Sequence, residues 1–218
     1  MASPTSPSDQ DPATMTAPAV YLASKSPRRE ELLRQLGIEF ASLRLRESPE
    51  RERDVVEGAH DAEPARHYVE RIARTKAAIG WQRMLQRNLP PRPVLGADTE
   101  VVLDDAIFGK PKDAADAVRM LTLLAGRTHH VLTAVAITWK ENTAAEISTS
   151  IVTFRAIPRD EIERYVATGE PFDKAGAYAI QGRAAALVQR IDGSYSGIMG
   201  LPLFETASAL AGIGFPVL

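Results

Sequence analysis

Hydroxyl and basic side chains that follow the first apolar run of the chain could bind an anion. Ser26-Pro27 is typical of a helix start, because serine is a good N-cap and proline suits the first helical position. Arg28 and Arg29 then fall in the first turn, where the positive pole of the helix dipole disfavours cations. Free backbone N–H groups point outward at that end, beside the Ser24 and Ser26 hydroxyls. Together these groups could hold a phosphate; the alternative is two surface arginines that pair with neighbouring acids.

A lysine lies beside the apolar stripe of the long helix expected over residues 64–85. Lys76 comes four residues after Ile72 and eight after Tyr68, which places it on or next to the buried side. It either extends back to solvent along that surface or reaches a pocket. In a pocket it needs a negatively charged partner.

A carboxylate follows the second apolar run. Asp98 comes directly after residues 93–97, which are typical of a buried strand. Open α/β folds bind ligands at the carboxyl ends of their strands, and a carboxylate there can hold a divalent metal or take a proton from water. The alternative is that Asp98 caps the strand end or a turn. Lys110, at the end of the hairpin expected over 101–108, could face the same cleft.

The segment 173–182 combines two glycines and small residues with one amide, Gln181. It suits the close approach of backbone to a flat ligand, and Gln181 could read a base edge because it both donates and accepts hydrogen bonds. The alternative is a tight glycine-rich loop without a ligand. Cations, a carboxylate and an amide together match a triphosphate that carries a base.

These residues must be positioned by a mixture of strands and helices. Early strands and helices alternate and later strands cluster, which predicts a mixed α/β domain with antiparallel additions to a central sheet. We expect a disordered tail at 1–18 and one domain at 19–218. Strands are expected at 19–23, 93–97, 101–103, 106–108, 129–139, 146–157 and 186–191, with a turn around Asn142 and helices at 26–36, 64–85, 113–125, 159–168 and 204–211.

Composition excludes several classes of protein. The chain has 218 residues, 44% of them hydrophobic, which is enough for a sizeable core. With no cysteine it has no disulfide, thiol nucleophile or zinc ribbon. A net charge of -2 gives no bulk attraction to nucleic acid or anionic lipid, and no apolar run is long enough to span a membrane. Residues 1–18 lack the basic start and apolar run of a secretory signal, so we expect a cytoplasmic protein. The four histidines lack metal-ligand spacing, and His129-His130 is interpreted as structural or exposed.

Several motifs in series resemble those of the Maf-type nucleoside triphosphate pyrophosphatases. They occur in the family's order and span roughly 20–206, which makes the resemblance specific. The matching segments are Leu22–Arg29 (LASKSPRR), Leu95–Thr99 (LGADT) with Gly109-Lys110-Pro111, Asp173–Tyr178 (DKAGAY) with Ile180-Gln181-Gly182, and Gly200–Leu203 (GLPL).

The resemblance implies a fold, a reaction and a set of site residues. The fold is an elongated mixed sheet with flanking helices around a central cleft, like that of the inosine triphosphate pyrophosphatases. The reaction is hydrolysis of a nucleoside triphosphate to the monophosphate and pyrophosphate with Mg²⁺ or Mn²⁺, usually in a homodimer. Asp98 takes the place of the family's catalytic acid, as proton acceptor or metal ligand. Arg28, Thr99 and Gln181 match positions that mark substrate choice, and the phosphate-binding set is matched by Ser24, Ser26, Arg29, Lys76 and Lys110.

Two details refine the resemblance. Thr99 and the Gln181-Gly182 pair are similar to the branch that acts on dTTP and UTP. The family's acidic pair after the first helix is absent, and Glu47 is its best counterpart as a second metal ligand. An alternative function is a nucleotide-binding regulator of septum formation with little turnover.

Overall fold

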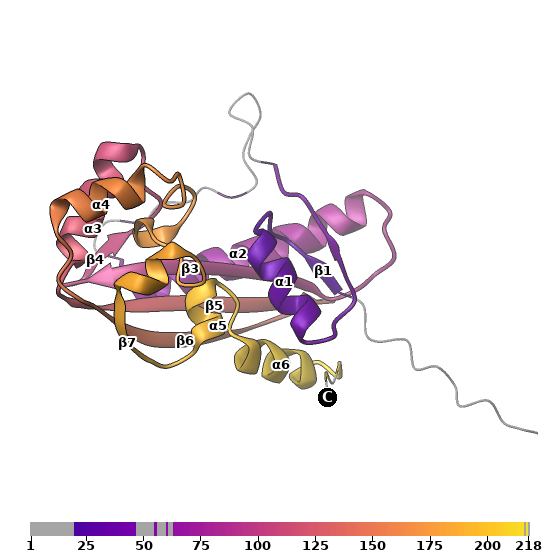
Figure 1. Cartoon of the computed structure of the whole chain (residues 1–218). Helices are drawn as coiled ribbons and strands as arrows, with labels where there is room; N and C mark the ends of the chain where they lie inside the picture. Colours follow the sequence, from indigo (N-terminus) through magenta and orange to yellow (C-terminus); the bar gives the residue numbers. More distant parts are fainter. Residues whose placement is uncertain (1–19, 47–54, 56–59, 61–62, 216, 218) are drawn as a thin grey trace, which may run out of the picture.

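The computed structural model describes residues 20–46, 55, 60, 63–215 and 217, so the expected tail at 1–18 and Glu47 lie outside the described residues. Helices and strands alternate along the first half and strands cluster in the second (Figure 1). In chain order the elements are β1 (Val20–Leu22), α1 (Pro27–Gln35), β2 (Phe40–Ser42), α2 (Ala65–Gln86), β3 (Val94–Leu103), β4 (Ala106–Phe108), α3 (Ala114–Leu124), β5 (Thr128–Trp139), β6 (Asn142–Phe154), α4 (Arg159–Val166), the 3₁₀ turns η1 (Ala175–Ala177) and η2 (Arg183–Leu187), β7 (Val188–Asp192), α5 (Tyr195–Met199) and α6 (Leu203–Gly212).

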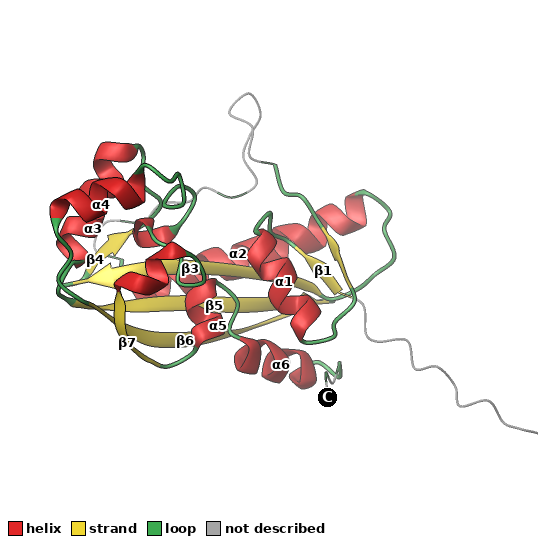
Figure 2. Ribbon diagram, in the orientation of Figure 1, coloured by secondary structure: helices red, strands yellow, loops and turns green. Residues whose placement is uncertain are grey.

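The described strands form one mixed sheet. Their order is β2-β1-β3-β5-β6-β7, and β4 pairs with β3 outside this path. The pairs β1–β2 and β1–β3 are parallel. The pairs β3–β5, β5–β6 and β6–β7 are antiparallel. The long strands β3, β5 and β6 run the length of the molecule and join its two ends (Figure 2). The predicted class, an elongated mixed sheet with flanking helices, is confirmed.

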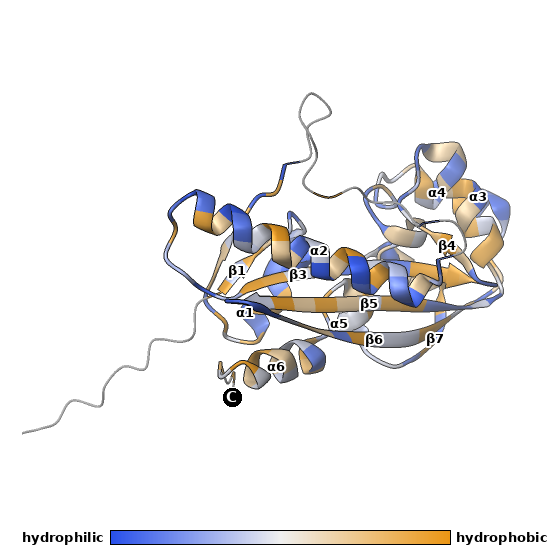
Figure 3. Cartoon of the chain, turned by 180° about the vertical axis from the view of Figure 1, so that it is seen from behind, coloured by the Kyte–Doolittle hydropathy of each residue, from blue (hydrophilic) through white to orange (hydrophobic). Residues whose placement is uncertain are grey.

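Helices cover both faces of this sheet. α2 lies across one face and packs on β3, β5 and β6, while α5 and α6 pack on β5 and β6 from the opposite side (Figure 1). Seen from behind, α2 lies in front of the sheet, and hydrophilic and hydrophobic residues alternate along its ribbon (Figure 3). None of the described helices combines the length and the apolar character that a membrane span requires.

One edge of β3 is left partly open. β3 pairs with β5 along nearly its whole length. On the other edge, β1 pairs only as far as Leu95, and β4 begins to pair at Val101. Among the strands that the structure describes, none pairs with residues 96–100 on this side. Side chains from both faces of β3 can therefore reach the same opening.

Several predicted elements differ from those observed. The runs expected at 93–97 and 101–103 form one strand, β3, because pairing with β5 carries the backbone through the polar residues between them. The turn expected around Asn142 lies at residues 140–141, and Asn142 already begins β6. β2 and α5 were not predicted, since three and five residues are too short to show a periodic pattern. Asp113 does cap its helix, accepting a hydrogen bond of 2.8 Å from the Asp116 amide.

Gly96 allows α2 to pack directly on β3. A Cβ atom at this position would lie 2.5 Å from the Ala77 nitrogen and 2.6 Å from the Ala73 carbonyl oxygen. Both are backbone atoms of a helix, so neither can move aside without displacing α2. The close contact brings the α2 turn that contains Lys76 against the middle of β3.

We expect Gly96→Ala to reduce the free energy of unfolding by about 3 kcal/mol or more, because it overpacks two rigid backbones. The measurement is chemical denaturation followed by circular dichroism. Gly212→Ala is the matched control, since a Cβ there meets no atom within 4 Å and the position is helical. It should leave stability unchanged or raise it by about 0.5–1 kcal/mol. Equal effects of the two substitutions would contradict this account of Gly96.

His129 is a core residue of β5, in agreement with the structural interpretation. It is 1% exposed, and its Nε2 shares a hydrogen bond of 3.0 Å with the Tyr178 hydroxyl. The imidazole packs edge-on against Phe154 and Tyr178. Burial penalises the charged form and, with a smaller effect from His130, lowers the pKa of His129 to about 4. The ring is therefore neutral in the folded protein at neutral pH.

This burial predicts a loss of stability in mild acid. In the unfolded chain a histidine has a pKa of about 6.5, so between pH 6.5 and 4 the unfolded state binds a proton that the folded state does not. The contribution of the neutral His129 ring to the free energy of unfolding is complete above pH 6.5. It decreases as the pH falls, by about 2–3 kcal/mol at pH 4.5. Denaturation of wild type and His129→Gln at pH 7 and 4.5 isolates this contribution from that of the carboxylates. His130→Gln, at the exposed neighbouring position, is the control and should lose stability in acid as the wild type does. If His129→Gln also loses as much stability between pH 7 and 4.5 as the wild type, His129 is not the source of the loss.

Candidate functional site

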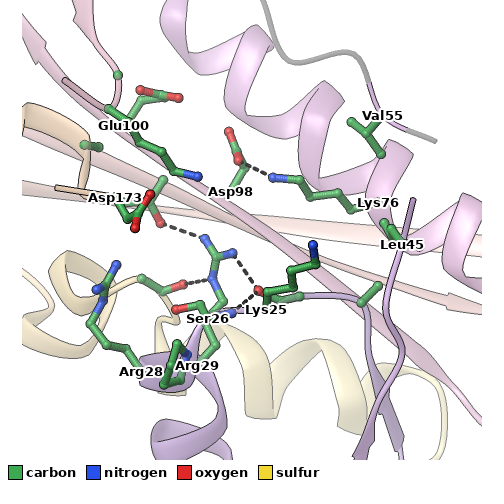
Figure 4. A pocket seen from close by; sticks show the side chains of 18 of the residues that line it. Lys25, Ser26, Arg28, Arg29, Leu45, Val55, Lys76, Asp98, Glu100 and Asp173 are labelled. Atoms are coloured by element: carbon green, nitrogen blue, oxygen red, sulfur yellow. Dashed lines mark hydrogen bonds and ion pairs between the residues drawn. The ribbon is translucent and has the colours of Figure 1, made fainter. Parts of the chain in front are cut away.

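A cavity of about 780 Å³ opens where β3 lacks a partner strand. Its walls come from the β1–α1 loop, the first turn of α1, α2, β3, the end of β4 and the loops near residues 173 and 200 (Figure 4). Eight of the nine residues predicted for catalysis or substrate binding line it: Ser24, Ser26, Arg28, Arg29, Lys76, Asp98, Thr99 and Lys110. Segments far apart in the sequence thus meet in one site.

Lys76 and Asp98 form an ion pair at the centre of the cavity. Lys76 Nζ donates to Asp98 Oδ1 at 2.8 Å, and the side chains are 14% and 10% exposed. Lys76 therefore takes the second of the two predicted courses, into a pocket with an acidic partner. The expected position of Asp98 at a strand end is wrong, because it lies in the middle of β3 opposite Ala134. The ion pair and the open edge of β3 make a charged residue tolerable at that point.

The other carboxylate oxygen of Asp98 faces a different environment. Asp98 Oδ2 is buried and accepts no hydrogen bond from the described residues. A buried carboxylate oxygen without a partner is costly unless a ligand satisfies it. This atom is the strongest sign in the cavity that a further group binds there.

Arg29 joins three segments of the cavity wall. Its Nε donates to the Gly200 carbonyl at 2.7 Å, Nη1 to Ser24 Oγ at 3.2 Å and Nη2 to Thr99 Oγ1 at 3.2 Å. Gly200 adopts a φ of +117°, a conformation that suits glycine and turns its carbonyl toward this arginine. Arg29 thus holds the β1–α1 loop, β3 and the end of α5 together, in addition to lining the cavity.

Arg28 and Ser26 present less constrained polar groups. The pKa of the Arg28 guanidinium is lowered by burial, which the Asp173 carboxylate partly offsets. An arginine so shifted stays charged at neutral pH. Ser26 is the N-cap of α1, but its side chain makes no capping hydrogen bond and lies at the cavity. Lys110 is exposed, so it belongs to the rim.

Gln181 does not line the cavity. It is exposed and lies in the turn between η1 and η2, and the structure does not bring it together with the other predicted residues. Glu170 fixes this turn, because its carboxylate accepts hydrogen bonds from the Arg183 amide at 3.0 Å and the Tyr165 hydroxyl at 2.9 Å. Gly182 is required beside it, since a Cβ there would lie 2.5 Å from Glu170 Oε1.

Four charged lining residues escaped prediction: Lys25, Arg46, Glu100 and Asp173. Glu100 had a signal that could have found it. Alternate residues of a strand share a face, so a carboxylate two positions after Asp98 points to the same side. That reading requires a strand that continues past Asp98, which the sequence pattern did not indicate.

Comparison with known proteins places this chain in a family. The family model described as Maf-like protein matches residues 19–213, which is most of the chain. The chain belongs to the Maf family. The predicted resemblance is therefore confirmed at the level of the family.

Close Maf relatives span nearly the same length. A protein of Aromatoleum aromaticum named dTTP/UTP pyrophosphatase is 55% identical over 199 residues, covering 91% of this chain and 97% of that protein. One of Nitrosomonas europaea with the same name is 52% identical over 198 residues, covering 91% and 96%. Among solved structures, the Staphylococcus aureus Ham1 protein gives a TM-score of 0.42 at 11% identity, over 78% of this chain and 90% of that chain, a distant likeness.

Proposed function

We propose that this chain hydrolyses dTTP and UTP between the α- and β-phosphates, giving the nucleoside monophosphate and pyrophosphate. The observation that carries the proposal is the charge of the cavity. Its described lining holds six basic side chains and three carboxylates: Lys25, Arg28, Arg29, Arg46, Lys76 and Lys110 against Asp98, Glu100 and Asp173. A surplus of cations in a walled cavity suits a polyphosphate.

The basic residues would orient the triphosphate for attack at the α-phosphorus. Arg28 and Lys110 line the cavity and would bind the β- and γ-phosphates. The Ser26 hydroxyl and the N-terminal amides of α1 would add neutral donors. Asp98 would accept the proton of the attacking water. Positioning and charge neutralisation supply most of the rate in phosphoryl chemistry.

A divalent cation, Mg²⁺ or Mn²⁺, fits beside Asp98. The buried Oδ2 atom without a hydrogen-bond partner is the kind of oxygen such an ion would coordinate. Among the described residues no three His, Cys, Asp or Glu side chains form a metal cluster, which is compatible with an ion that takes its other ligands from phosphates and water. When bound, the ion would neutralise charge on the phosphate oxygens and lower the pKa of a coordinated water.

The preference for pyrimidine nucleotides rests on the names of the relatives and on matching residues. Both relatives described above are named dTTP/UTP pyrophosphatases. Arg28 and Thr99 line the cavity. By their resemblance to the family's substrate-choice positions, they would contact the nucleotide. Gln181 would contact the base only if the 173–182 segment closes over a bound nucleotide. The proposal also includes a homodimer and a cytoplasmic location. Light scattering, which measures the mass of the particle in solution, tests the homodimer.

The deciding experiment is a ³¹P NMR time course with Mg²⁺ or Mn²⁺ and each of dTTP, UTP, CTP, GTP and 7-methyl-GTP. We expect monophosphate and pyrophosphate from dTTP and UTP, and much slower reaction of the others. Inorganic phosphate with a nucleoside diphosphate would mean attack at the γ-phosphorus and would refute the proposal. Binding of dTTP without any product would instead favour the nucleotide-binding regulator.

A further inference from the structure

Asp98 is accompanied by a second carboxylate on the same face of β3. Successive side chains of a strand point to opposite sides, so Asp98 and Glu100 point to the same side and Thr99 to the other. The face they share is the one on which α2 packs. Asp98 is 7% exposed and Glu100 is 8% exposed, although both line the cavity. Two acidic side chains are thus held at the base of a cavity with little access to bulk water.

The polar environment of Asp98 leaves one oxygen for a ligand. Lys76 Nζ holds Oδ1 at 2.8 Å, whereas Oδ2 is buried without a hydrogen-bond partner among the described residues. The unpartnered Oδ2 atom is evidence for a bound ligand that does not depend on two acidic residues lying near each other.

Glu100 brings its carboxylate to the other side of the same opening. Its Oε2 lies 3.8 Å from the position that a Cβ of Gly109 would occupy, next to Lys110. In Figure 4, Asp98 lies between Glu100 on one side and Lys76 on the other. A Glu side chain is one methylene longer than Asp, so the two carboxylates can approach a common ion from adjacent rungs of the strand.

The same chain lacks the acidic pair that the family resemblance places after the first helix. Glu47 is the best counterpart there, and an arginine-rich stretch follows it. Hard divalent cations in phosphate-processing sites are commonly held by one or two carboxylates together with substrate phosphates. Such a site has room for a second carboxylate, and β3 supplies a buried one in Glu100.

We propose that Asp98 and Glu100 together form this protein's part of the divalent-cation site, with Glu100 serving as the second carboxylate ligand. This inference rests on the proposed function for the presence of a metal. It goes beyond that proposal by assigning the second ligand to β3 rather than to the loop that contains Glu47.

The test is Mn²⁺ binding, measured by the EPR signal of free Mn²⁺ with and without the non-hydrolysable analogue α,β-imido-dTTP. Glu100→Gln and Asp98→Asn should each weaken Mn²⁺ binding about tenfold or more. Glu47→Gln should have a smaller effect than either. Glu141→Gln is the matched control, because Glu141 is exposed in the β5–β6 turn, and it should bind like wild type.

Wild-type affinity in Glu100→Gln, or no Mn²⁺ binding by the wild-type protein, would overturn the assignment. If Glu100→Gln does not fold, Glu100→Asp gives the same test, because it withdraws the carboxylate by one methylene. An unchanged Mn²⁺ affinity of Glu100→Asp would also overturn the assignment of Glu100 as a ligand. Failure of the proposed function looks different. Mn²⁺ binding that depends on Glu100, in a protein that does not hydrolyse dTTP, would refute the activity and leave the metal site standing.

Discussion

Asp98→Asn is expected to lower kcat for dTTP by about 10³-fold or more, equivalent to about 4 kcal/mol of transition-state stabilisation. Asparagine keeps the shape of the side chain but cannot accept a proton at neutral pH and carries no charge for a cation. Its amide oxygen can still accept the hydrogen bond from Lys76, so the wall of the cavity should remain in place. Kinetics by a pyrophosphate-coupled assay, with circular dichroism of the same samples, provide the measurement.

Stability should change much less than activity in this variant. The Lys76–Asp98 pair is mostly buried, and loss of its negative member costs about 1–3 kcal/mol after solvent access is allowed for. Asp105→Asn is the matched control, because Asp105 is an exposed residue of the β3–β4 turn with a φ of +67°, which asparagine tolerates well. A folded Asp98→Asn protein with more than about a tenth of wild-type kcat would remove Asp98 from the catalytic role.

Arg29→Met is expected to destabilise the protein by about 2–4 kcal/mol and to reduce kcat/KM at least 100-fold. The guanidinium satisfies acceptors on three separate segments, and its loss leaves the Gly200 carbonyl without its charged donor. Arg29→Lys should restore little, because one ammonium cannot replace a planar fork that reaches three acceptors. Chemical denaturation and steady-state kinetics measure both effects.

The neighbouring residue provides the comparison. Arg28→Met should raise KM for dTTP strongly and change stability by less than about 1 kcal/mol, since no hydrogen bond to the protein fixes its guanidinium in the described residues. The two arginines stand side by side in one motif, yet one organises the cavity and the other faces the ligand. Equal losses of stability in both variants would show that this division of roles is incorrect.

Local sequence was sufficient for most of the secondary structure. Proline at the first position of α1, the Asp113 cap of α3 and the apolar stripe of α2 depend on residues within one or two helical turns. The Asp104-Asp105 turn was predicted for the same reason, and both residues adopt positive φ as a two-residue hairpin requires. Short elements such as β2 and α5 were missed because their stability comes from their neighbours in space.

Eight of the nine residues predicted for catalysis or substrate binding line one cavity, but their geometry was not predictable. The sequence did not decide where the Lys76 side chain points, since a lysine beside an apolar stripe can reach solvent or a pocket. The choice depends on Asp98, which is 22 positions away and is brought close by Gly96. Gln181 shows the opposite case, because a suitable residue in a suitable motif lies outside the cavity.

The sequence by itself determined the order of the longer elements, the Asp113 cap, the Asp104-Asp105 turn and the motifs that identify the family. The tertiary structure alone decided that β3 runs unbroken through Asp98 and that its edge stays open between β1 and β4. Propensity and capping act between near neighbours in the chain, so they are visible in a linear pattern. Strand pairing joins segments dozens of residues apart. An unpaired stretch of edge, with the cavity it creates, exists only once every neighbouring strand has taken its place.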